Sequence, residues 1–260
     1  MKRSAAGTFP SYKQATKRIA KKNRKGTASV ARTRGAATTG EMKYFDCDRT
    51  ATNIAACTTT WVAGTLVNPG TTINLGDAAV ANPLCLFVPK PTASLNGRIG
   101  RKVKVFKIKV NGMIRTPDGN SATVSYGASR VRIILVMDKQ TNAGPMTAAQ
   151  LMNDGTSSDT TLCSYQNPNN FGRFRVLKDK MVTLQDPNIG VAAAGTDFNG
   201  LTVPFKFSVN FKVPILVNFN ATVGGTCADI IDNSFHFICA TNVTELAPTV
   251  TYYSRVCYKE

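Results

Sequence analysis

The feature that most constrains the fold is the spacing of the apolar residues after position 40, which recur with a period of two. In the clearest stretch, Phe205–Val213, every odd-numbered residue is apolar and every even-numbered residue is polar. A strand turns successive side chains to opposite faces, so this stretch predicts a β-strand with one buried face. Pro204 and Pro214 are expected to mark its ends, because proline lacks the N–H that a sheet interior uses.

Other segments repeat this pattern with informative departures. Arg130–Met137 alternates at first and then becomes apolar throughout, which predicts a strand that is buried on both faces near its end. In Lys102–Arg115 the apolar phase changes between Val105 and Phe106, which predicts a β-bulge. The remaining strand candidates are Arg173–Leu184, Ser234–Ala240, Thr249–Tyr258 and, more weakly, Met42–Cys47 and Ala55–Val67.

One short helix is predicted over Gly144–Met152, which has a proline near its start and helix-forming residues after it. The connections over 68–97 and 111–128 are too long for tight hairpins. Many strands joined by long connections favour a Greek-key sandwich over an up-and-down barrel. We therefore expect an all-β fold: a single eight-stranded jelly roll of two packed antiparallel sheets.

The charge divides the chain into two parts. Of the 260 residues, 32 are Lys or Arg and 15 are Asp or Glu, a net charge of +17. Residues 1–40 contain eleven of the basic residues and no acidic one, and they have few large apolar side chains. We expect 1–40 to be a disordered basic arm when alone, and 41–260 to be the jelly-roll domain.

A basic arm of this kind is typical of nucleic-acid binding, with a solubilising tail as the alternative. The predicted contacts in the arm are Lys13, Lys17, Arg18, Lys21, Lys22, Arg24, Lys25, Arg32 and Arg34. The densest six, Lys17, Arg18, Lys21, Lys22, Arg24 and Lys25, are also predicted to form a nuclear import signal read by a host import receptor. In the body, Lys104, Arg173 and Arg175 are weaker candidates on strand faces, where lysines or arginines could equally serve solubility.

No catalytic residue, metal site or cofactor is predicted. The single histidine, His236, occupies an ordinary alternating strand position, and the seven cysteines never form a C-x-x-C motif. Asp46 with Asp48, or Asp154 with Asp159, could bind a hard cation, but solvated loop acids are the favoured interpretation. With no long apolar run and no visible signal peptide, we expect no membrane partner and reduced thiols in an intracellular protein.

The order of segments resembles a known family of viral proteins. Gly97–Val105 leads to Val110–Ile114, and a strand ending in Leu135–Lys139 is followed by Gly144, Pro145 and the short helix. Arg173–Asp179 comes next, and the chain closes with Phe235–Ala240 and Pro248–Tyr258. This order resembles the coat proteins of geminiviruses and related small circular single-stranded DNA viruses, and also those of satellite necrosis viruses, which package RNA. The resemblance covers 97–185 well and 203–260 loosely, and does not extend to 41–96.

The resemblance implies a structural capsid protein in the virion and host nucleus, with identical subunits closing an icosahedral shell around single-stranded nucleic acid. It leaves DNA and RNA cargo both open, with circular single-stranded DNA preferred, and it implies no enzyme. The arm lacks the Cys and His residues of a finger-like motif, so no metal role carries over. The alternative is a nucleic-acid-binding β protein without a shell, either cellular or of the viral movement or shuttle type. Some of Phe45, Trp61, Phe87 and Val88 are expected in subunit contacts.

Overall fold

The computed structural model describes residues 41–67, 71–73, 85–116, 129–184, 202–243 and 247–260, with 71–73 described by their backbone alone. By its internal contacts the chain divides into two units, Met1–Glu41 and Met42–Glu260. All of the helices and strands in the described residues belong to the second unit. The arm residues predicted to bind nucleic acid or an import receptor therefore lie outside the described residues.

The described chain is built mainly of strands, with a few short helical turns between them. In order, the elements are β1 (Lys43–Asn53), η1 (Ala63–Thr65), β2 (Thr71–Ile73), β3 (Lys102–Arg115), β4 (Ser129–Asp138), α2 (Ala148–Leu151), α3 (Ser158–Leu162), η2 (Pro168–Asn170), β5 (Phe174–Leu184), β6 (Thr202–Phe219), η3 (Cys227–Asp229), β7 (Ile230–Asp232), β8 (Ser234–Thr241) and β9 (Thr249–Lys259). None of the helices among these elements is long and apolar enough to cross a membrane.

The strands form two antiparallel sheets. Sheet A has the order β2-β1-β9-β3-β6-β7, and sheet B has the order β5-β4-β8. Only Asn233, with a positive φ of 60°, separates β7 from β8, so these two form one strand that bends from sheet A into sheet B. Counted in this way, eight strands form a five-stranded and a three-stranded sheet, which confirms the predicted all-β sandwich.

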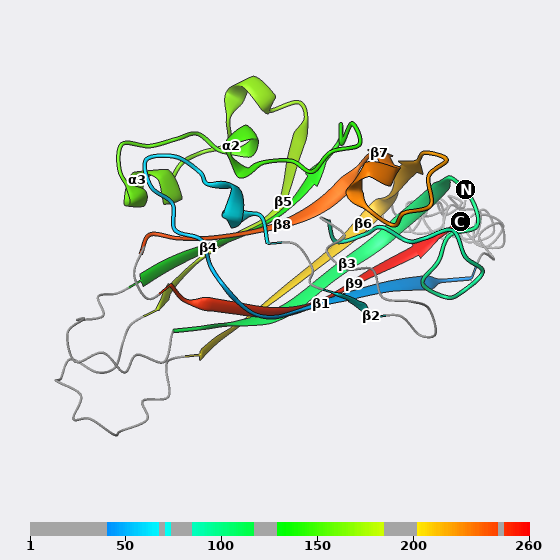
Figure 1. Cartoon of the computed structure of the whole chain (residues 1–260), viewed down its shortest axis with the longest axis horizontal. Coiled ribbons are helices and arrows are strands. Elements are labelled where there is room, and N and C mark those ends of the chain that lie inside the picture. The colour runs from blue at the N-terminus through cyan, green and yellow to red at the C-terminus, as the bar shows by residue number, and fades with distance from the viewer. Residues whose placement is uncertain (1–40, 68–70, 74–84, 117–128, 185–201, 244–246) are drawn as a thin grey trace, which may run out of the picture. The chain divides into compact units, whose positions relative to one another are not determined.

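The chain crosses between the sheets in the manner of a jelly roll. From β3 it passes to β4 and β5 in sheet B, returns to β6, bends into β8 and ends in β9 between β1 and β3. Figure 1 shows β1, β9, β3 and β6 running side by side in one layer, with β4, β5 and β8 in the other. The pairing of non-consecutive strands is the Greek-key feature that the long connections predicted.

The fourth position of sheet B, beside β8, is filled by irregular chain. Cys57, Val67 and Leu86 each donate a backbone hydrogen bond to β8, to Thr241 (2.8 Å), Phe237 (2.9 Å) and Phe235 (2.8 Å) respectively. The prediction of a strand over Ala55–Val67 is therefore wrong. The reason is Trp61, whose indole N–H bonds to Asn153 O (3.1 Å) and Ser164 Oγ (3.2 Å), which draws the chain away from β8.

The main core lies between the two sheets. Phe237 of sheet B stacks on Phe205 (5.9 Å between ring centroids) and packs against Tyr252 (4.7 Å), both in sheet A. Gly112 is needed beneath this group, because a Cβ there would lie 2.5 Å from the Phe205 ring and 2.6 Å from Thr251 O. Aromatic packing of this kind stabilises the sandwich beyond the area it buries.

A second core covers the outer face of sheet B. Ile134 and Val136 of β4 pack there with Trp61, Leu151 of α2 and Leu162 of α3, and Figure 1 shows both helices over this sheet. Sheet B is thus buried on both faces, and the predicted double burial of Arg130–Met137 near its end is confirmed.

Several finer predictions can now be compared with the structure. The phase change in β3 is confirmed as a register shift between Val105 and Lys107 against both neighbouring strands. The predicted helix is confirmed as α2, which begins with a capping box between Thr147 and Gln150. Sequence reasoning missed α3, whose apolar content is too small for a helical pattern.

Two predictions are wrong. Pro204 and Pro214 lie inside β6 and do not bound it, since β6 has a neighbour on its second side only at residues 218–219, and Pro214 falls where the register against β3 shifts. Phe45, Trp61, Phe87 and Val88 do not lie at the surface: each is at most 4% exposed, inside one of the two cores. Three of these four residues lie in irregular chain and only Phe45 lies in a strand, so most of their segments show no clear alternation of apolar and polar residues.

Candidate nucleic-acid interface

The outer face of sheet A is exposed and basic. Its three adjacent strands β9, β3 and β6 contain no acidic residue. Their basic residues are Lys102, Lys104, Lys107, Lys109 and Arg115 on β3, Lys206 and Lys212 on β6, and Arg255 and Lys259 on β9. The apolar residues of β3, such as Val103 and Ile108, point the other way into the core. Over β9, β3 and β6, sheet A therefore separates an apolar core from an outer surface whose charged side chains are all basic.

The strand register brings these cations into neighbouring rows. Lys104 lies opposite Lys259 of β9, and Lys109 lies opposite Arg255. Within β3, Lys107 and Lys109 are half-buried, because their aliphatic stems lie along the sheet. Among the described residues, Lys104, Lys107 and Lys109 have no carboxylate within ion-pair distance.

The position of Cys257 shows how closely these charges gather. Its thiol lies on the same face, beside Lys107 in the register. Burial raises the pKa of Cys257, while the positive charges of Lys109, Arg255 and Lys107 oppose that shift. A phosphate placed over this row would meet the same three cations.

An aromatic and arginine cluster borders the basic rows on the β1 side. Asp46 accepts hydrogen bonds from both Nε (2.8 Å) and Nη2 (2.6 Å) of Arg255, and another from the Tyr253 hydroxyl (2.7 Å). The Arg255 guanidinium lies 5.4 Å from the centre of the Tyr44 ring. The hydrogen bonds to Asp46 raise the pKa of Arg255, and burial followed by the bond to Asp46 raises the pKa of Tyr253. One carboxylate thus fixes the orientation of an arginine and a tyrosine.

The arginines of sheet B are arranged differently. Arg173 donates to Asp138 through Nε (3.0 Å) and Nη2 (2.7 Å), and this pairing raises the pKa of Arg173. Arg132 pairs in the same bidentate way with Asp179 and also donates to two backbone carbonyls. Of the predicted body residues, Lys104 and Arg175 are exposed, whereas Arg173 is already engaged by a buried carboxylate.

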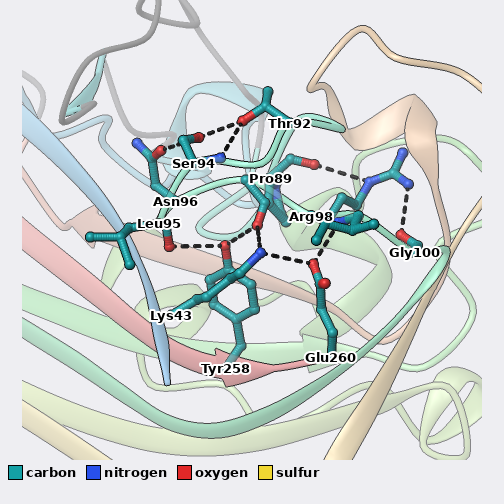
Figure 2. Close-up of polar contacts among 12 residues, drawn as sticks. Lys43, Pro89, Thr92, Ser94, Leu95, Asn96, Arg98, Gly100, Tyr258 and Glu260 are labelled. Carbon is teal, nitrogen blue, oxygen red and sulfur yellow. Dashed lines mark hydrogen bonds and ion pairs between the residues drawn. The ribbon is translucent and has the colours of Figure 1, made fainter. Parts of the chain in front are cut away.

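The corner where β1 begins and β9 ends is held by a polar network (Figure 2). Lys43 donates to Gly97 O (3.4 Å) and pairs with Glu260 (3.3 Å), which also accepts from the Ile99 backbone N–H (2.6 Å). Tyr258 donates to Gly97 O (2.6 Å) and Arg98 to Pro89 O (3.1 Å). These bonds tie the loop over 89–100 to the strand ends, so we assign the network a structural role.

The described residues show no cluster of three His, Cys, Asp or Glu side chains that could hold a metal ion. Three of the four carboxylates considered for a cation make other contacts: Asp46 binds Arg255, Asp154 accepts from the Trp61 backbone N–H, and Asp159 accepts from Asn242. His236 is buried within hydrogen-bond distance of Ser234 Oγ (2.7 Å). All seven cysteines are free thiols.

Sequence reasoning singled out Lys104 of β3 but missed its neighbours on β6 and β9. Lys206 alternates with buried phenylalanines, so its position on an exposed face is predictable, but its proximity to β3 is not. Arg255 and Tyr253 come 146 and 144 positions after Lys109 in the chain, and only the sheet order places them together.

No protein-family model matches the sequence, and comparison with curated proteins gives no match. Among solved structures, the chain is similar to the capsid protein of Penaeus stylirostris densovirus, with 9% sequence identity, 85% of each chain covered and a TM-score of 0.17. At a TM-score of 0.17 this similarity carries no argument about the fold or the function of the chain.

Proposed function

We propose that this chain is the structural subunit of a viral capsid, in which identical copies close into an icosahedral shell around single-stranded nucleic acid. The observation that carries the proposal is the combination of a jelly-roll sandwich with a preceding 40-residue sequence of eleven basic and no acidic residues. A jelly roll alone also serves lectins and cupins, so the fold by itself does not give the function. The polycationic arm is what favours a nucleic-acid cargo over a sugar or a small molecule.

The proposed mechanism is electrostatic and independent of base sequence. Lysine and arginine side chains displace counterions from phosphates, and the release of those ions drives binding. The six densest arm residues would contribute most, with the exposed lysines of sheet A adding a fixed surface. This role needs no catalytic step and no cofactor. Circular single-stranded DNA is the proposed cargo, on the family resemblance of the sequence.

The assembly test uses the purified full-length chain, examined by sedimentation, electron microscopy and nuclease digestion. We expect particles in the megadalton range that protect single-stranded nucleic acid. A full-length variant with Lys17, Arg18, Lys21, Lys22, Arg24 and Lys25 replaced by Gln should protect less. Its slope of log affinity against log salt should be shallower by about 4, since each phosphate contact contributes about 0.7. A control that exchanges Lys for Arg and Arg for Lys at the same six positions should behave like the unchanged chain.

The alternative function is nucleic-acid binding without a shell, which the basic face of sheet A favours because that face needs no assembly to act. A protein that binds single strands but stays a monomer or small oligomer at all concentrations would replace the capsid proposal with this one.

Nuclear entry through a host import receptor is the last part of the proposal. A fluorescent fusion of residues 1–40 should accumulate in the nucleus, and replacing the same six basic residues by Ala should abolish that accumulation. If the substituted fusion still accumulates in the nucleus, the proposed import role of these six residues is wrong, whereas their proposed role in nucleic-acid binding is unaffected.

A further inference from the structure

We propose that the outer face of sheet A is itself a binding surface for single-stranded nucleic acid, in which Tyr44 and Tyr253 stack on bases while Lys104, Lys107 and Lys109 contact phosphates. The inference deepens the proposed function and rests on it only in taking single-stranded nucleic acid as the ligand. It assigns base contacts to the jelly roll, which the arm mechanism does not.

Charge complementarity identifies the occupant as a polyanion. Three neighbouring strands carry only basic ionisable side chains outward apart from the thiol and hydroxyl groups of Cys257 and Tyr253, and no acid occurs anywhere in these strands. Lysines two positions apart in a strand are spaced about 6.7 Å apart. Lys107 and Lys109 therefore form a regular row, comparable to successive phosphates of an extended strand, with Lys104 continuing it beyond the bulge.

The aromatic side chains distinguish a nucleic acid from other polyanions. Tyr44 and Tyr253 point to the outer face of sheet A, where they are 44% and 37% exposed. Their inward-facing neighbours Phe45 and Tyr252 are each only 2% exposed. Tyr44 and Tyr253 lie on either side of Arg255, whose planar guanidinium is a third surface on which a base can stack. Sulfated sugars and lipid headgroups have no flat ring that would use these surfaces.

The cluster is held in place before any ligand arrives. Asp46 binds both Arg255 and the Tyr253 hydroxyl, so neither side chain has to be ordered on binding. Fixing these rotamers in advance reduces the entropy cost of association. Asp46 also offsets the charge of Arg255, which makes this side of the face suited to bases while the β3 side remains suited to phosphates.

The same arrangement favours a single strand over a duplex. In a duplex the bases are stacked inside and only the phosphates lie outside, so the tyrosines would gain nothing from it. On an extended strand the bases can turn toward one side and the phosphates toward the other. The face presents its aromatic and cationic groups in this divided way, on β1 and β9 and on β3 respectively.

The decisive experiment compares ring and charge substitutions in the full-length chain by fluorescence anisotropy. The probes are a short single-stranded oligonucleotide, an abasic strand of equal length, the matching duplex and heparin. Y44T/Y253T should lose at least about fivefold per ring toward the base-bearing strand and less than twofold toward the abasic strand. Y44F/Y253F keeps both rings but loses the bond from the Tyr253 hydroxyl to Asp46, so it should bind slightly less tightly than the unchanged chain and far more tightly than Y44T/Y253T.

The lysine substitutions on sheet A have a matched control on sheet B. K104Q/K107Q/K109Q should weaken binding to all four probes and reduce the salt slope for single strands by about 2, which is three contacts at about 0.7 each. The triple variant R130Q/K178Q/K180Q removes the same charge from exposed positions of β4 and β5 in sheet B, none of them a candidate contact, and should change the slope far less.

Two outcomes would overturn the inference: equal losses toward base-bearing and abasic strands in Y44T/Y253T, or equal effects of the two charge variants. Circular dichroism and thermal unfolding check that each variant folds.

Ultraviolet cross-linking of single strands to the unchanged protein gives an independent test: adducts at Tyr44 or Tyr253 support the inference, and adducts confined to residues 1–40 contradict it. Electron microscopy measures assembly separately from binding. If particles form but the outer face of sheet A does not bind single strands, this inference alone is rejected. If that face binds single strands but no particles form, only the capsid proposal is rejected.

Discussion

The two sheets differ in what covers their outer faces. Sheet B carries α2, α3 and the chain around Trp61 on its outer face, so Ile134 and Val136 are buried there. On sheet A the outward residues of β3 are exposed or half-buried, and Met113 among them is 46% exposed. Ion pairs occur on both sheets, with Arg132 and Arg173 paired on the sheet B side and Arg255 paired with Asp46 on sheet A. Among the described residues, however, Lys104, Lys107 and Lys109 of β3 have no carboxylate within ion-pair distance. The outer face of sheet B is thus buried beneath a second core, whereas the outer face of sheet A is exposed and basic over β9, β3 and β6.

The largest expected effect compares one outward residue from each sheet. Ile134→Ala should lower the free energy of unfolding by about 2–5 kcal/mol, because it leaves a cavity beneath α2. Met113→Ala on sheet A should change it by less than about 0.5 kcal/mol. Urea unfolding of the soluble subunit measures both, and similar values for the two would contradict the division between the faces.

The second comparison concerns the ion pairs. Asp138→Ala should cost about 3 kcal/mol, because the Asp138 side chain is fully buried and its loss leaves Arg173 without its partner in a partly buried site. Asp46→Ala removes a partner of Arg255, whose side chain is 45% exposed, and should cost no more than about 1 kcal/mol. High salt should reduce the second value further, and a larger loss for Asp46→Ala would reverse our ranking of the two pairs.

A third substitution tests how tightly the inner face of sheet A is packed. Gly112→Ala should destabilise by about 1–3 kcal/mol, since the new methyl group meets the Phe205 ring and the Thr251 carbonyl. Gly172→Ala is the matched control, because nothing lies within 4 Å of a Cβ there. A well-tolerated Gly112→Ala would mean that the Phe205 ring and the chain at Thr251 can move aside, and would contradict this close packing.

The smallest expected effect is the alkylation of a single cysteine thiol. Iodoacetamide at pH 8 should modify Cys163, the exposed thiol, and leave the six buried cysteines unmodified. Burial raises the pKa of Cys57 to about 12, so this thiol stays protonated and unreactive at that pH. Mass spectrometry before and after unfolding gives the count, and early labelling of Cys57 would show that the cover of sheet B opens.

How far the sequence predicts this structure depends on whether a feature is local. The bounds of Lys102–Arg115 and its bulge are predictable, because alternation and its phase are visible within one strand. The chain over 55–67 is not, since its path is set by hydrogen bonds from Trp61 to residues 92 and 103 positions away. The positions of Pro204 and Pro214 depend on which strand lies at a sheet edge, which alternation does not reveal.

The candidate interface follows the same rule. Lys104 is recognisable as an outward residue from its strand alone. The engagement of Arg173 by Asp138 is not recognisable, because it requires β4 and β5 to be paired in one particular register. Tyr44 and Tyr253 carry no sequence signal for a shared surface, since β1 and β9 occupy opposite ends of the described chain.

The pairing of β1 with β9 also determines when the protein can fold. Asp46 and its partner Tyr253 are 207 residues apart, so at a synthesis rate of about 5–20 residues per second β1 waits about 10–40 s for β9 to emerge. Until then β1 has only the three-residue β2 as a sheet neighbour, and its free edge can pair with another chain. Contacts between such distant segments also make closure itself slow. The nascent chain is therefore most exposed to misassembly on the ribosome, and chaperone supply during translation should govern how much soluble subunit is recovered.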